Sequence, residues 1–339
     1  VQTMTKTDTR DVAATVAQIQ EVAGLGCDIV RVAVPDANAA HAIRDIRRQI
    51  SIPLVADIHF DYRLAVVAVE SGADGLRINP GNIGSAAKVK EVVRAAGERG
   101  IPIRIGVNSG SVEKDIAARH GGPTAEALVE SAIGHVRILE DLDFRAIKIS
   151  VKASDALRTV DAYRLLSERT DYPLHLGVTE AGTFMAGAVR SSVAMGMLLA
   201  GGIGDTVRVS LTDAPAREVR VGLEILRSLG MREPGPGVIS CPTCGRIEVD
   251  VISVANRLEE ELERYYRDNP GCAHPVVAVM GCMVNGPGEA KHADIAVAGG
   301  RGKFAIYERG EPAGTVMEKE VVDAVLCRVR GWKSESSNA

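Results

Sequence analysis

Three cysteines in the last third of the sequence have a spacing suited to metal or redox chemistry. Cys241 and Cys244 enclose a Cys-x-x-Cys turn, and Cys282 follows at the end of an apolar run that reads as a strand. A structural zinc ribbon needs a second close cysteine pair, and a thioredoxin-like dithiol should open a helix within a compact βαβ unit. An iron–sulfur cluster accepts thiolates from separated loops, so the spacing favours an iron–sulfur site.

The fourth ligand of such a cluster has two candidates, Cys272 and Glu289. A strand of five residues, at about 3.3 Å each, separates Cys272 from Cys282 by well over the width of a cluster. Glu289 follows Cys282 across a Gly-Pro-Gly turn that can fold back, and a carboxylate is a harder, more exchangeable ligand than a thiolate. We therefore expect Glu289 to be the fourth ligand. Cys27 and Cys327 lie in periodic apolar segments, which predicts that they are small buried hydrophobes.

A second set of polar residues interrupts the apolar runs of the first two thirds of the chain. Burying a charge in such a run costs several kcal/mol unless the charge is paired or meets a ligand. Asp57 and Glu180 are the obvious acidic neighbours, so the surplus of cations predicts a polyanionic ligand such as a diphosphate. The basic residues in question are Arg31, Arg77, Arg104, Lys148 and Arg208, with His175 in the same kind of position.

Further polar residues flank these runs. His59, two residues after Asp57, is a candidate proton carrier near neutral pH, although a loop histidine is common. For any single charge, a structural ion pair inside the fold remains the alternative. Side chains that can add hydrogen bonds just beyond the runs are those of Asn79, Asn108, Ser150, Lys152 and Ser210.

The elements that carry these residues repeat along the chain. Eight β-rich runs are each followed by a segment of helical periodicity, which over about 230 residues predicts a (β/α)8 TIM barrel, with a doubly wound open sheet as the alternative. In a barrel the carboxyl ends of the strands form the active-site face. The runs are Val1–Met4, Asp28–Val34, Pro53–Asp57, Asp74–Ile78, Pro102–Val107, Arg145–Val151, Pro173–Val178 and Asp205–Leu211.

The alternating Pro and Gly of Glu233–Gly237 mark a domain boundary, because neither a helix nor a strand ladder can continue through them. We expect a barrel domain at 1–235, a small α+β iron–sulfur domain at 236–332, and a frayed tail at 333–339. The expected elements of the small domain are helices near Val249–Arg267 and Val316–Val329, with strands at Val276–Met280, Asp294–Val297 and Lys303–Tyr307.

The composition excludes several classes of function. The 339 residues carry a formal net charge of −4, and aromatic residues make up 3%, which disfavours nucleic-acid binding and base stacking. No apolar run reaches the length of a membrane helix. No signal peptide opens the sequence, which favours reduced or metal-bound cysteines and a cytoplasmic location.

Eight longer stretches resemble the bacterial-type 4-hydroxy-3-methylbut-2-enyl diphosphate synthases of the non-mevalonate isoprenoid pathway. The resemblance implies a TIM barrel joined to a [4Fe–4S] domain. It also implies reductive ring opening of 2-C-methyl-D-erythritol 2,4-cyclodiphosphate, with two electrons consumed and water and the allylic diphosphate released. The stretches are Ala56–Ala65, Leu76–Gly84, Ile103–Asn108, Lys148–Ser154, Leu174–Gly182, Asp205–Leu211, Ser240–Arg246 and Gly281–Ala290.

Position by position, the resemblance implies roles for individual residues. The implied cluster ligands are Cys241, Cys244, Cys282 and Glu289. The implied diphosphate site consists of Arg31, Arg77, Arg104, Lys148, Arg208 and Ser210. The residues implied to position the carbon skeleton or supply protons are Asp57, His59, Asn108 and Glu180.

The resemblance also implies partners. The electron donor would be reduced ferredoxin or flavodoxin, and the protein would form a head-to-tail homodimer in which the cluster of one chain covers the barrel of the other. Two alternatives remain from the residues alone. One is a phosphate-handling barrel aldolase or isomerase with a structural zinc domain, and the other is a zinc-stapled nucleic-acid-binding module, which the acidic pI disfavours.

Overall fold

A computed structural model describes residues 1–232, 235, 237–283, 288 and 293–332. The chain divides into two compact units, Val1–Arg232 and Glu233–Ala339. Glu233, Pro234 and Pro236 of the expected boundary, Glu289 and the tail 333–339 lie outside the described residues.

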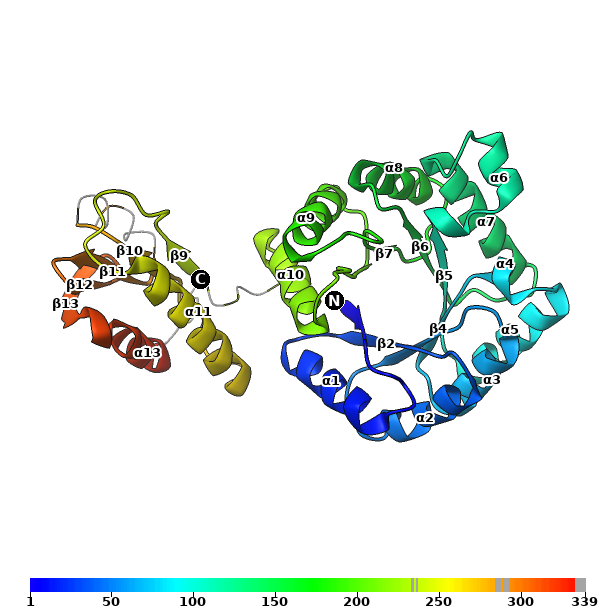
Figure 1. Ribbon diagram of the computed structural model, residues 1–339, viewed down its shortest axis with the longest axis horizontal. Coiled ribbons are helices and arrows are strands. Elements are labelled where there is room, and N and C mark those ends of the chain that lie inside the picture. Colours follow the sequence, from blue (N-terminus) through cyan, green and yellow to red (C-terminus); the bar gives the residue numbers. More distant parts are fainter. Residues whose placement is uncertain (233–234, 236, 284–287, 289–292, 333–339) are drawn as a thin grey trace, which may run out of the picture. The chain divides into compact units, whose positions relative to one another are not determined.

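The first unit is the predicted TIM barrel, a ring of short parallel strands surrounded by helices (Figure 1). Six strands pair in chain order, and a two-stranded sheet continues the ring through a single bridge between Ile149 and Leu174. The last two strands are shorter than predicted. In order, the strands are β1 (Gln2–Met4), β2 (Ile29–Ala33), β3 (Leu54–Asp57), β4 (Gly75–Ile78), β5 (Ile103–Asn108), β6 (Ile147–Lys152), β7 (His175–Leu176) and β8 (Thr206–Val207).

Helices form the outer layer of the barrel, and several begin at an aspartate that follows a loop. The Asp11, Asp36 and Asp155 side chains each accept a backbone N–H of the first turn, which is the usual N-cap. The short helices α4 and α6 are additions to the expected pattern. The helices are α1 (Val12–Gly24), α2 (Ala37–Arg47), α3 (Tyr62–Glu70), α4 (Pro80–Ile83), α5 (Ala86–Arg99), α6 (Lys114–Arg119), α7 (Ala125–Glu140), α8 (Ala156–Ser167), α9 (Phe184–Ala200) and α10 (Pro215–Ser228).

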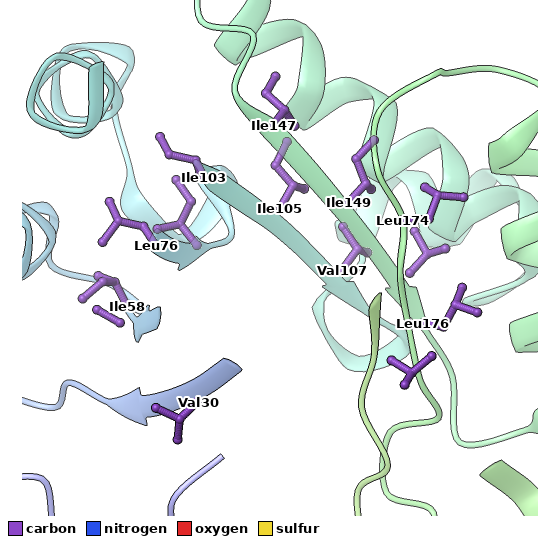
Figure 2. Close-up of a cluster of buried hydrophobic side chains, with 14 of the residues drawn as sticks. Val30, Ile58, Leu76, Ile103, Ile105, Val107, Ile147, Ile149, Leu174 and Leu176 are labelled. Carbon is purple, nitrogen blue, oxygen red and sulfur yellow. The ribbon is translucent and has the colours of Figure 1, made fainter. Parts of the chain in front are cut away.

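The alternation of side chains along β5 and β6 separates the core from the site. Ile103 and Ile105 of β5 and Ile147 and Ile149 of β6 belong to one buried apolar cluster (Figure 2). Because successive side chains of a strand point to opposite faces, the residues between them, such as Arg104, face the interior of the ring.

The second unit is a small α+β domain. Its sheet has the order β13-β12-β11-β10-β9, and helices α11 and α13 share one apolar cluster with it. The five strands are β9 (Val238–Ser240), β10 (Val277–Met280), β11 (Ile295–Gly300), β12 (Lys303–Glu308) and β13 (Glu311–Met317), and the helices are α11 (Val251–Asp268) and α13 (Val321–Gly331). None of the described helices in either unit is long and apolar enough to cross a bilayer.

Two expectations for the small domain are wrong. The last helix begins at Val321, because Val316 and Met317 complete β13, which pairs with β12 and overrides the helical pattern. Cys327 is exposed on α13 rather than buried. Cys27, in contrast, is buried as expected, and its thiol donates to the carbonyl oxygen of Ile29.

Candidate functional site

Asp57 organises one side of the barrel interior. Its Oδ1 lies 3.2 Å from Nη1 of Arg77, and its Oδ2 lies 3.6 Å from Nε of Arg31. Burial alone would raise the pKa of Asp57, but the charges of Arg31 and Arg77 and a hydrogen bond with His59 outweigh it and lower the pKa. The carboxylate is therefore ionised at neutral pH and is shared by two arginines.

Arg104 has no such partner. Both of its terminal nitrogens, Nη1 and Nη2, are buried without a hydrogen-bond partner, and the residue is only 5% exposed. Burial, followed by the charge of Arg77, lowers the pKa of Arg104 to about 9, so it is still a cation at neutral pH. A buried guanidinium with unused donors is the strongest indication of an anionic ligand in the barrel.

Lys152 and Arg208 add two more buried basic side chains. Burial, and then the charges of Arg104 and Arg208, lowers the pKa of Lys152 well below its ordinary value. Nη2 of Arg208 lies 3.9 Å from Oε2 of Glu218, and its Nε has no partner. Five cations (Arg31, Arg77, Arg104, Lys152 and Arg208) thus share two buried carboxylates, those of Asp57 and Glu218.

Two glycines make room for these cations inside the ring. A Cβ on Gly106 would lie 2.6 Å from Nε of Arg77, and one on Gly177 would lie 2.5 Å from Nζ of Lys152. Side chains at these two positions would displace the cations. The glycines are therefore part of the site even though they offer no side-chain chemistry.

The structure separates the two lysines of β6. Lys148, near the start of the strand, is half-buried and lines a cavity of about 270 Å³ at the amino-terminal ends of the strands, which Arg104 and His175 also line. Lys152 is the last residue of the same strand and is buried among the arginines. The sequence pattern and the resemblance favoured Lys148 for the diphosphate site and gave Lys152 only a supporting place. Position along the strand is the signal that distinguishes the two.

The other predicted residues lie on loops at the carboxyl ends of the strands. His59 follows β3, is largely exposed, and places Nε2 3.6 Å from Oδ2 of Asp57. Asn108 ends β5 and is half-buried, and Ser210 is half-buried beyond β8. Glu180, beyond β7, is exposed and has φ 52°, a left-handed conformation that is uncommon for a residue other than glycine.

Buried histidine and hydroxyl groups complete the interior. His175 is 1% exposed, its Nδ1 lies 2.8 Å from Oγ1 of Thr206, and its Nε2 has no partner. Burial, followed by the charge of Arg104, lowers the pKa of His175 well below its ordinary value. The imidazole is therefore neutral at physiological pH and adds no charge to the cluster.

Two of the three candidate cluster cysteines, Cys241 and Cys282, follow neighbouring strands at one edge of the small sheet. β9 and β10 are parallel neighbours, so Cys241 after β9 and Cys282 after β10 leave the sheet at the same end. The backbone N–H of Gly281 donates to Sγ of Cys241 at 3.2 Å, the type of hydrogen bond that tunes iron–sulfur clusters. Between Cys241 and the exposed Cys244, Thr243 adopts φ 61°.

This donor set fits an iron–sulfur cluster in its chemistry. Thiolates from two loops are the ligands that such clusters take, and the N–H···S contact is already formed. Among the described residues, no group of three or more His, Cys, Asp or Glu side chains is placed to hold a metal ion. Glu289, the expected fourth ligand, is outside the described residues. Cys272 packs against the apolar cluster of the domain.

A cleft of about 510 Å³ opens beside Cys282. Its walls include the exposed side chains of Arg246 and Arg301, together with Glu248 and Met283. The backbone N–H of Arg301 donates to Oε2 of Glu248 at 2.6 Å, which ties the two walls together.

Comparison with known proteins matches both units to domains of one protein family. A family model described as the GcpE TIM-barrel domain matches residues 1–223, and one described as the GcpE protein C-terminal domain matches residues 237–331. The chain is 56% identical over 329 residues to the 4-hydroxy-3-methylbut-2-en-1-yl diphosphate synthase (flavodoxin) of Geobacter sulfurreducens, covering 97% of this chain and 92% of that protein. It is 58% identical over 311 residues to the Maridesulfovibrio salexigens enzyme of the same name, covering 92% and 85%. A solved dihydropteroate synthase from Yersinia pestis covers 68% of this chain and 92% of its own, with a TM-score of 0.48 at 9% identity, too distant to inform the site.

Proposed function

The chain belongs to the GcpE family, and on that premise we propose that it reduces 2-C-methyl-D-erythritol 2,4-cyclodiphosphate to 4-hydroxy-3-methylbut-2-enyl diphosphate. This makes it an oxidoreductase of isoprenoid biosynthesis. The observation that carries the proposal is the buried surplus of cations around Arg104, whose terminal nitrogens have no protein partner. A cyclic diphosphate supplies both the negative charge and the acceptor oxygens that this interior lacks.

In this proposal the barrel binds the diphosphate through Arg31, Arg77, Arg104, Lys152 and Arg208, with Ser210 adding a hydroxyl at the mouth. Lys152 replaces Lys148, because it is Lys152 that is buried among the arginines. Asp57 fixes the orientation of Arg31 and Arg77, whose Nη2 atoms also donate to Sδ of Met4 and to the carbonyl oxygen of Gly106, respectively. The ligand then neutralises charge that the fold has already buried.

His59 is the proposed proton donor for the departing water. It is exposed at the mouth, and its Nε2 lies 3.6 Å from Oδ2 of Asp57. Asn108 and Glu180, at the ends of neighbouring parts of the ring, position the carbon skeleton. The left-handed backbone of Glu180 supports a functional constraint at this point of the loop.

The small domain is proposed to hold a [4Fe–4S] cluster through Cys241, Cys244, Cys282 and Glu289. When bound, the cluster supplies the electrons that opening the ring consumes. The N–H of Gly281 donates to Sγ of Cys241, and Thr243, between Cys241 and Cys244, has a left-handed backbone. The protein is proposed to work in the cytoplasm, where its six thiols remain reduced.

Flavodoxin is the proposed electron donor, as in the names of the relatives. The cleft beside Cys282 supports this choice, because Arg246 and Arg301 offer positive charge next to a cluster ligand. An acidic donor protein would dock there with its cofactor close to the cysteines.

A head-to-tail homodimer is proposed from the outer face of α9. Met185, Val189, Val193 and Met197 are spaced four residues apart and are 71%, 54%, 45% and 39% exposed. Arg190 is the one charged residue of this helix. A contiguous apolar stripe of this kind fits a second copy of the same chain, and V193K should give a monomer in analytical ultracentrifugation.

Anaerobic turnover tests the function directly. Protein purified without oxygen should be brown, contain iron and sulfide, and convert the cyclic diphosphate when reduced flavodoxin is supplied. A colourless zinc protein that forms no allylic diphosphate would instead support a barrel aldolase or isomerase with a structural zinc domain.

A further inference from the structure

We propose that Glu218 is a positioning residue that orients Arg208 toward the diphosphate and closes the barrel between its last and first strands. This inference rests on the proposed function, because it assigns Arg208 to ligand binding. Glu218 is in the first turn of α10 and is 1% exposed. A buried glutamate in a helix that otherwise covers a barrel requires a specific set of partners.

The structure gives Glu218 four such partners from two parts of the chain. The hydroxyl of Thr3 in β1 donates to Oε2 at 2.7 Å, and the backbone N–H of Leu211 donates to Oε1 at 3.0 Å. Nζ of Lys6 lies 3.2 Å from Oε1, and Nη2 of Arg208 lies 3.9 Å from Oε2. Both carboxylate oxygens are thus occupied by donors, two of them charged.

These contacts lie where the strand ladder is interrupted. Within the described residues, no strand pairing joins β8 to β1, although all the other neighbours in the ring are connected. Glu218 bridges this seam by binding Thr3 on one side and Leu211 on the other. Lys6 strengthens the bridge, because its Nζ also donates to the carbonyl oxygen of Leu211 at 2.8 Å.

The same carboxylate is the nearest counter-charge of Arg208. The guanidinium of Arg208 faces other cations of the ring, Arg77 among them, and Glu218 and Asp57 are the carboxylates that offset them. Glu218 attracts one terminal nitrogen, Nη2, while Nε has no protein partner. The carboxylate therefore restrains the guanidinium from one side and leaves donors available for a diphosphate oxygen.

Glu218→Gln tests this role, because it keeps the shape of the side chain but removes its charge and one acceptor. Glu218→Asp keeps the charge, and Glu224→Gln, on the same helix with an exposed side chain, is the matched control. The full-length chain is titrated with inorganic diphosphate by calorimetry, a measurement that does not require turnover. We expect about tenfold weaker binding for E218Q, within threefold of wild type for E218D, and no change for E224Q.

Turnover supplies a second readout, which a purely structural role would not move in the same way. E218Q should raise KM for the cyclic diphosphate by the same factor and change kcat less than twofold, at a temperature well below its unfolding midpoint. Wild-type affinity in E218Q would overturn the inference, as would equal losses in E218Q and E218D. In either case the proposed function would stand, whereas a wild-type protein that binds no diphosphate would overturn the function itself.

Discussion

The two units prepare their sites in different ways. In the barrel, the candidate ligand-binding side chains lie on or next to strands and are buried. Asp57 and Glu218 orient them through ion pairs, and two glycines leave the space that they occupy. In the small domain, the candidate ligands are on turns, and Cys244 is exposed. The barrel interior has an excess of buried positive charge, which a bound anion would neutralise. The proposed thiolate site would be completed only when the cluster binds.

The largest effect should come from the small domain. C241A removes a proposed cluster ligand and the acceptor of the Gly281 N–H, so we expect loss of bound iron and a drop in turnover of more than about 1,000-fold. Binding of inorganic diphosphate by the barrel should stay within twofold of wild type. C272A is the control, because Cys272 packs against the core of the same domain. Iron retained at wild-type levels in C241A would contradict the ligand assignment.

The next effect compares the two lysines of β6. K152M removes a buried cation of the proposed site, so diphosphate binding should weaken about 30-fold, or ~2 kcal/mol. The ligand-free protein should become more stable by about 1–3 kcal/mol, because an incompletely paired buried charge is replaced by an apolar group. K148M should change binding less than threefold, since Lys148 is only half-buried near the start of β6, whereas Lys152 is buried at its end. A larger loss of diphosphate binding in K148M than in K152M would show that Lys148, and not Lys152, belongs to the diphosphate site.

These two residues also show how far the sequence can be interpreted. The interruption of apolar runs by Arg31, Arg77 and Arg104 predicted cations inside a barrel, because alternation places every second residue toward the interior. It favoured Lys148 over Lys152, although both have inward parity on β6. The distinction depends on height along the barrel axis, which is set by strand boundaries and tilt.

Other features depended on tertiary contacts that no local pattern encodes. From its residue type, Glu218 is expected on the surface of an amphipathic helix. The one feature of the sequence that indicates burial is its position next to Val219, on the buried face of that helix. The strand β13 exists because it pairs with β12, and the pattern around Val316 is equally compatible with a helix. Spacing alone favoured iron–sulfur over zinc chemistry, and the family motifs implied the same four cluster ligands.

A smaller effect should come from the glycines of the barrel. A Cβ on Gly177 would lie 2.5 Å from both the carbonyl oxygen of Arg208 and Nζ of Lys152, so G177A should destabilise the protein by about 1–3 kcal/mol in urea unfolding. A Cβ on Gly97 in α5 would meet no atom within 4 Å from outside its own stretch of helix, and G97A should stabilise by about 0.5–1 kcal/mol. Equal effects of the two variants would show that Gly177 is not there to make room for a cation.

The smallest effect concerns the pH dependence of the free energy of unfolding of the barrel, to which His175 should contribute. Burial and the nearby cations lower the pKa of His175, so the folded protein binds no proton there at a pH where the unfolded chain, with a histidine pKa of about 6.5, does. The free energy of unfolding therefore falls as the pH drops below about 6.5, by up to ~1.4 kcal/mol per pH unit. Above about pH 6.5 the contribution of His175 is complete and no longer changes with pH. H175Q should reduce this slope between pH 6.5 and 5 and leave the part that His135 contributes, because burial also lowers the pKa of His135, while H41Q, on the exposed side of α2, should keep the full slope. Because Asp57 has a lowered pKa, its contribution is lost only below about pH 4, outside this window. An unchanged slope in H175Q would mean that the interior histidine takes up its proton in the folded state, and that the barrel tolerates a sixth buried cation.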